Sequence, residues 1–62
     1  MSKRDVADDL FSVVMKRYKK EKLTVHVTSS MMDTIWFVLY GKVREDGEEK
    51  AKKYAETTEL VW

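Results

Sequence analysis

From about Lys3 to Lys20, apolar residues recur at the spacing of an amphipathic helix. With successive side chains about 100° apart around the axis, the apolar ones fall on one continuous arc and most charged ones lie opposite. Ser2 and Asp5 are spaced as a capping pair at the start of this helix. The apolar arc consists of Val6, Ala7, Leu10, Phe11, Val13, Val14 and Tyr18. We therefore predict a first helix that buries this arc.

Polar and apolar residues alternate over residues 22–28, as they do in a half-buried strand. Residues 34–40 are rich in β-branched and aromatic side chains, which strands favour. Residues 29–33 are expected to connect the two runs. Because a lone strand needs a partner, we expect the two runs to pair as a β-hairpin.

The second of these runs also permits a helix. Its apolar residues at helical spacing are Met32, Ile35, Trp36, Leu39, Tyr40 and Val43. Ser30 would be a candidate cap, while Met31, Phe37 and Val38 would make the helix apolar nearly all round. A domain of this size has little interior in which to bury such a helix. We therefore favour the hairpin and keep the helix as the alternative.

A last helix is predicted from about Glu48 to about Glu59. Asp46 and Gly47 form a turn signal before it, and acidic residues in its first turn suit the helix dipole. Its inward stripe is Ala51, Tyr54, Ala55 and Thr58.

The order helix–strand–strand–helix predicts an α+β fold, with two helices packed on one face of a β-hairpin. Residues 1–62 are expected to form a single small domain. The alternative is a mostly α chain of helix–strand–helix–helix order, which is similar to a ribbon-helix-helix dimer.

Composition argues against catalysis and against cofactors. The 62 residues include no cysteine, so disulfides and thiolate metal sites are excluded. A single histidine, His26, cannot build a zinc or haem site without several carboxylates around it. Two glycines are too few for the loops that cradle phosphate groups. We expect no catalytic residues, no cofactor and no metal.

The chain is expected to be cytoplasmic and not to enter a membrane. Its longest apolar run, residues 35–40, is far shorter than the roughly 20 residues that span a bilayer. The first five residues include three charged ones and lack the apolar core of a secretion signal. The lack of cysteine also suits a reducing compartment.

One face of the predicted hairpin is a candidate protein interface. If Phe37 and Leu39 face the helices, the opposite face is aromatic and rimmed by cations, and monomers rarely leave such a patch bare. The interface candidates are Trp36, Val38, Tyr40, Lys42 and Arg44. We expect a non-enzymatic regulator or inhibitor that acts through protein–protein contacts, such as a viral or accessory modulator of a larger host machine. Homodimerisation through this face, or its cover by residues 60–62, stays open.

A basic cluster supplies an alternative function. Residues 16–22 hold five positive charges, which could follow a phosphate backbone while Tyr18 stacks on a base. The same cations also suit the C-terminal end of a helix. The nucleic-acid candidates are Lys16, Arg17, Lys19, Lys20 and Lys22. The alternative is therefore a small nucleic-acid-binding protein or transcriptional regulator.

Overall fold

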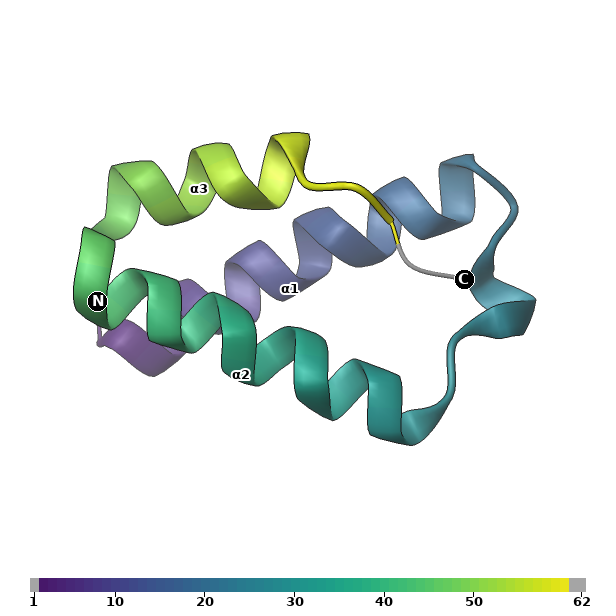
Figure 1. The fold of residues 1–62 in the computed structure, drawn as a ribbon, viewed down its shortest axis with the longest axis horizontal. Coiled ribbons are helices and arrows are strands. Elements are labelled where there is room, and N and C mark those ends of the chain that lie inside the picture. Colours follow the sequence, from purple (N-terminus) through teal and green to yellow (C-terminus); the bar gives the residue numbers. More distant parts are fainter. Residues whose placement is uncertain (1, 61–62) are drawn as a thin grey trace.

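The computed structural model describes residues 2–60, which form three α-helices and a short 3-10 helix (Figure 1). The elements are α1 (Lys3–Lys20), η1 (Thr24–His26), α2 (Ser29–Asp46) and α3 (Glu48–Thr57). None of residues 2–60 lies in a β-strand. The α+β fold with a hairpin is therefore wrong, and the mostly α alternative describes the chain better, although its strand is also missing from this part of the chain.

The prediction for α1 is confirmed at both ends. At the start, the amide of Asp5 donates to the Oγ of Ser2 at 3.1 Å. Along the helix, the predicted arc supplies the buried residues Val6, Ala7, Leu10, Val14 and Tyr18. Local periodicity and a local cap are sufficient to define this element.

The predicted strand over residues 22–28 is wrong, because the backbone amides of its first two residues form the hydrogen bonds that end α1. Lys22 has a left-handed φ of 59°. The amide of Lys22 donates to the carbonyl of Lys19, and the amide of Leu23 donates to the carbonyl of Tyr18. This pair of hydrogen bonds is a Schellman motif, which ends a helix and turns the chain away. The alternating residues that follow therefore lie in a connection.

The predicted strand over residues 34–40 is also wrong, because this stretch lies inside the 18-residue helix α2. Thr28, rather than Ser30, caps α2, since its Oγ1 accepts a hydrogen bond from the amide of Met31 at 3.2 Å. Strand propensity is a weak preference that side-chain packing can override. Here the packing of one side of α2 decides the outcome.

That side of α2 fills the space between α1 and α3. Leu39 is 1% exposed and Val43 is 5% exposed. They belong to one buried cluster with Val6, Leu10, Val14, Tyr18, Ala51 and Ala55. Burying a side chain such as Leu39 contributes about 1.5–3 kcal/mol relative to leaving it in water. This gain exceeds the few tenths of a kcal/mol that separate ordinary residues in helix propensity.

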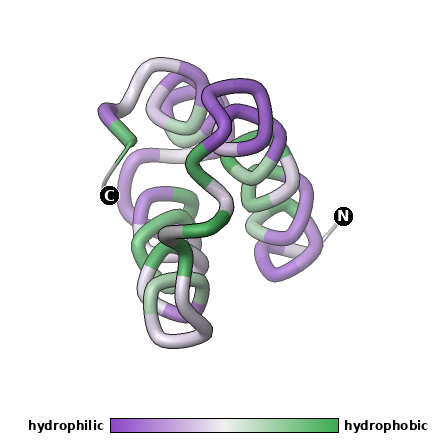
Figure 2. The backbone as a smooth tube through the Cα atoms, turned by 90° about the vertical axis from the view of Figure 1, so that its right-hand side faces the viewer, coloured by the Kyte–Doolittle hydropathy of each residue, from purple (hydrophilic) through white to green (hydrophobic). Residues whose placement is uncertain are grey.

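The small interior does limit α2, as the sequence suggested, but it does not prevent the helix. Phe37 is 66% exposed and Val38 is 40% exposed, so part of the apolar surface of α2 stays on the outside. Colouring by hydropathy shows apolar residues on more than one side of α2, while α1 is hydrophilic on its outer side (Figure 2). The helix forms because one buried stripe is enough.

The connection into α3 fits its sequence. Gly47 has a φ of 90°, a left-handed conformation that favours glycine. α3 ends at Thr57, slightly before the predicted end near Glu59. Ala51 and Ala55 are fully buried, so their small side chains let α3 lie close against the other helices.

Replacing Leu39 and replacing Phe37 should have very different effects on stability. We expect Leu39→Ala to lower the free energy of unfolding by about 2–5 kcal/mol, because it leaves a cavity in the core. Phe37→Ala should change it by less than about 1 kcal/mol, because this side chain is mostly exposed. Urea unfolding followed by circular dichroism measures both. A hairpin would bury both side chains, so equal losses would contradict the helical assignment.

Candidate interaction surface

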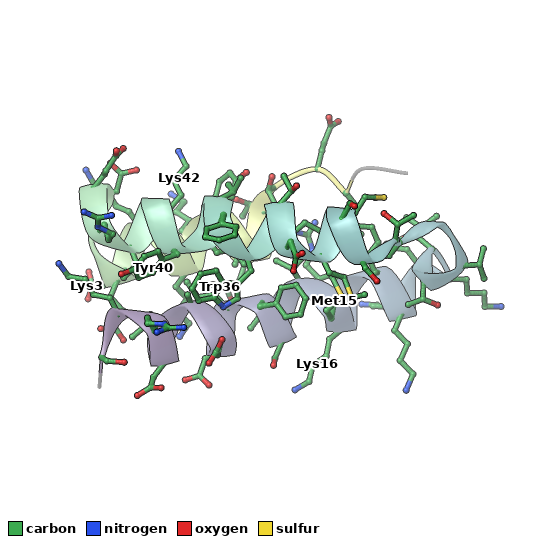
Figure 3. All side chains as sticks on the ribbon, turned by 90° about the horizontal axis from the view of Figure 1, so that it is seen from below. Lys3, Met15, Lys16, Trp36, Tyr40 and Lys42 are labelled. Carbon is green, nitrogen blue, oxygen red and sulfur yellow. The ribbon has the colours of Figure 1, made fainter. Side chains whose placement is uncertain are left out.

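The helical conformation of α2 divides the predicted interface residues between two sides. In a strand, Trp36, Val38 and Tyr40 would share a face, but in a helix residues two apart point in different directions. Trp36 and Tyr40 lie between α1 and α2, whereas Lys42 points to the side of α2 away from α1 (Figure 3). The structure therefore keeps Trp36 together with Tyr40 and separates them from Lys42.

The aromatic side chains of α2 form an ordered group. The rings of Trp36 and Tyr40 are stacked, with centroids 5.1 Å apart and planes inclined by 21°. The ring of Phe37 meets that of Trp36 edge-on, with centroids 5.3 Å apart. The guanidinium of Arg44 lies 5.7 Å from the centroid of the Tyr40 ring, within cation–π range. Three predicted candidates, Trp36, Tyr40 and Arg44, thus come together with a residue that was predicted to face inward.

Trp36 joins this group to α1. Its indole Nε1 donates to the Oδ1 of Asp8 at 2.7 Å. Because the indole is half-buried and bonded at its edge, its orientation is set before any partner arrives. Phe37 lies beside it and is the most exposed aromatic side chain among residues 2–60. We use the term outer face of α2 for Asp33, Phe37, Tyr40, Gly41 and Arg44, with Trp36 at its edge.

Phe37 was missed as a surface residue because a strand with Leu39 facing inward also turns Phe37 inward. The alternative interpretation, a helix over these residues, would have predicted the exposure of Phe37. Around such a helix the inward stripe from Met32 through Leu39 to Val43 leaves Phe37 well to one side. An inward stripe chosen at helical period would have identified it.

The other flank of α2 faces α3. The Nζ of Lys42 lies 5.0 Å from the centroid of the Tyr54 ring and 3.8 Å from the Oδ2 of Asp46. Val38 and Tyr54 line an apolar hollow of about 170 Å³, which Leu60 also lines. Residue 60 therefore brings the chain to this flank. Cover of the aromatic face by residues 60–62 was an alternative left open by the sequence, and residues 61–62 lie outside the described residues.

The basic cluster is only partly available to a ligand. The Nη1 of Arg17 donates to the carbonyl oxygen of Ala55 at 2.9 Å, which ties α1 to α3. The hollow beside Arg17 has a volume of about 460 Å³ and is lined by cations and also by two acids. Its charged lining residues are Lys16, Arg17, Lys20, Glu21 and Glu56. Lys19 is exposed on α1, and Lys22 lies in the Schellman turn.

Comparison with protein-family models, with curated proteins and with solved structures finds no match. Within residues 2–60, no three histidine or acidic side chains converge in a way that could hold a metal ion. No helix in the described part of the chain is both long and apolar enough to cross a membrane. The function must therefore be argued from the surface of the molecule.

The hydrogen bond of Arg17 should be measurable in stability. Arg17→Met keeps the apolar stem but removes the donor, so we expect the free energy of unfolding to fall by about 1–2 kcal/mol. Lys16→Met is the matched control, because Lys16 is exposed, and it should change stability by less than about 0.5 kcal/mol. Thermal and urea unfolding would report both. Equal effects would show that the Arg17 bond contributes nothing.

Proposed function

We propose that this protein works by binding another protein chain through the outer face of α2. The observation that carries the proposal is Phe37, an aromatic side chain that is 66% exposed within an ordered aromatic group. Phe37 is exposed beside the half-buried rings of Trp36 and Tyr40, and contiguous exposed apolar surface of this kind is where proteins contact partners. Tryptophan, tyrosine and arginine, which surround Phe37, are the residues that most often dominate binding energy.

The order of this group supports binding because it reduces the entropy lost on association. The Trp36–Tyr40 stack and the Trp36–Asp8 hydrogen bond already restrict the side chains that a partner would contact. Each flexible side chain that must be immobilised costs about 0.5–1.5 kcal/mol of affinity. A preformed surface avoids part of that cost.

Nucleic-acid binding has less support from the geometry. Arg17 already donates to the backbone of α3, and Glu21 and Glu56 line the same hollow as the lysines. Acids beside a phosphate-binding surface oppose the backbone charge that supplies most non-specific affinity. The outer face of α2, by contrast, holds one acid and one base around aromatic rings.

The finer proposal is a regulator or inhibitor in the cytoplasm. A small chain with one contact face acts on a larger protein by covering part of that protein's surface or by tethering that protein. The lack of cysteine in the sequence supports a reducing compartment.

Placing a charge at Phe37 should abolish partner binding. We expect tagged Phe37→Asp to lose the specific bands that the unaltered chain retains from a nuclease-treated cytosolic lysate, because the carboxylate would have to be buried in the contact. Val25→Asp is the matched control, since Val25 is 83% exposed in the connection near η1, away from α2. It should retain the bands.

Two results would count against this proposal. Bands that survive Phe37→Asp in a folded chain would remove the outer face of α2 from consideration. Bands or nucleic acid that disappear with nuclease treatment, and not with Phe37→Asp, would instead favour the basic cluster.

A further inference from the structure

We propose that a second copy of this chain binds the outer face of α2, in an antiparallel arrangement with two-fold symmetry. This inference rests on the proposed function in one respect: it takes the same face of α2 as a contact surface.

The exposed residues of the outer face have the spacing of a helix–helix seam. Successive members are separated by three, four, three and four positions, which is the spacing of the residues that face a partner helix in a coiled coil. The two central members are aromatic, and the outer members are polar or charged. The members are Ser30, Asp33, Phe37, Tyr40 and Arg44. All are exposed except Tyr40, which is half-buried. Asp33, Phe37 and Arg44 are exposed on this side of α2, whereas Tyr40 lies at its edge, between α1 and α2 (Figure 3).

The seam is complementary to itself when the two helices run in opposite directions. In a two-fold interface, if residue i contacts residue j of the second copy, then j also contacts i. The midpoint between Phe37 and Tyr40 along α2 falls between positions 38 and 39. The midpoint between Asp33 and Arg44 falls at the same place. An axis at that midpoint therefore sets Phe37 against Tyr40 of the second copy, and it does so twice.

The same axis pairs the charges. Asp33 and Arg44 are 11 positions apart on one helix, which is about 16 Å, so they cannot pair within the chain. Among residues 2–60, the recorded salt bridge is Lys42–Asp46, and Asp33 is in none. Across the axis, Asp33 of each copy faces Arg44 of the other. Two ion pairs would then flank the aromatic centre.

Gly41 supplies an independent observation. A Cβ added to Gly41 would meet nothing within 4 Å, so the monomer does not need a glycine there. Glycine inside a helix costs about 0.5–1 kcal/mol relative to alanine. Gly41 follows Phe37 by four positions, so its bare backbone lies beside Phe37 and leaves room for a ring of the second copy. Packed helices lie 8–10 Å apart depending on the side chains at the contact, and a glycine leaves room for such a ring.

The chain itself does not cover this side of α2 in its described part. Leu60 and the end of α3 lie at the flank that holds Val38 and Tyr54. The seam is only one helix wide, so we expect less than the roughly 1,200 Å² that a standard interface buries. A reversible monomer–dimer equilibrium with a micromolar or weaker dissociation constant follows.

Two variants, each with one reversed charge, test this arrangement. Asp33→Arg places two arginines at each end of the seam, and Arg44→Asp places two aspartates there. Each variant alone should dissociate at least about tenfold more readily than the unaltered chain in sedimentation velocity, because both ion pairs become repulsions. An equimolar mixture should associate again, because every end then pairs an acid with a base.

The controls reverse charges outside the seam. Glu45→Arg, next to Arg44 on α2, and Lys52→Asp on α3 should each self-associate like the unaltered chain. Circular dichroism checks that the variants fold, and Asp33→Lys with Arg44→Glu would replace a variant that does not.

Three results would overturn the inference. The unaltered chain could remain monomeric up to about 1 mM, a concentration that would reveal even a weak dimer. The single variants could associate as well as the controls, or their mixture could stay monomeric. If the chain is monomeric while Phe37→Asp still loses a lysate partner, the second copy is excluded and the proposed function stands. If Phe37→Asp loses no partner either, both fail.

Discussion

The burial of one stripe of α2 between α1 and α3 is the contact on which the rest of this structure depends. Leu39 and Val43 are the α2 residues that reach the centre of the molecule. Within the described chain, α1 and α3 cover only part of the apolar surface of α2. Phe37 and Val38 are exposed for this reason, and so the surface feature with functional interest is a direct consequence of the fold.

The same packing also determines which surfaces are free to bind. The guanidinium of Arg17, a member of the basic cluster, is engaged within the fold, because it donates a hydrogen bond to the carbonyl of Ala55 and so links α1 to α3. The Val38 flank is closed in part by Tyr54 and Leu60. The outer face of α2 has no such cover in the described chain, and it combines ordered rings with one charge of each sign.

The two outer helices could be predicted from the sequence, but α2 and the connection before it could not. The first helix is specified by its period and by Ser2, and the last by Gly47 and two buried alanines. In α2, β-branched and aromatic residues favour a strand while their spacing also fits a helix, and only packing against two distant segments decides. The interface prediction inherited this error: a period of two placed Trp36, Val38 and Tyr40 on one face, whereas the helical period keeps Trp36 with Tyr40 and turns Val38 to another side.

A dilution series followed by the amide resonances of α2 tests most directly the central claim that two copies of this chain meet through the outer face of α2. We predict that resonances of residues 33, 37, 40, 41 and 44 shift with concentration, while those of the Val38 flank and of η1 stay fixed. Shifts confined to the Val38 flank, or no shifts up to about 1 mM, where even a weak complex is populated, would contradict the account.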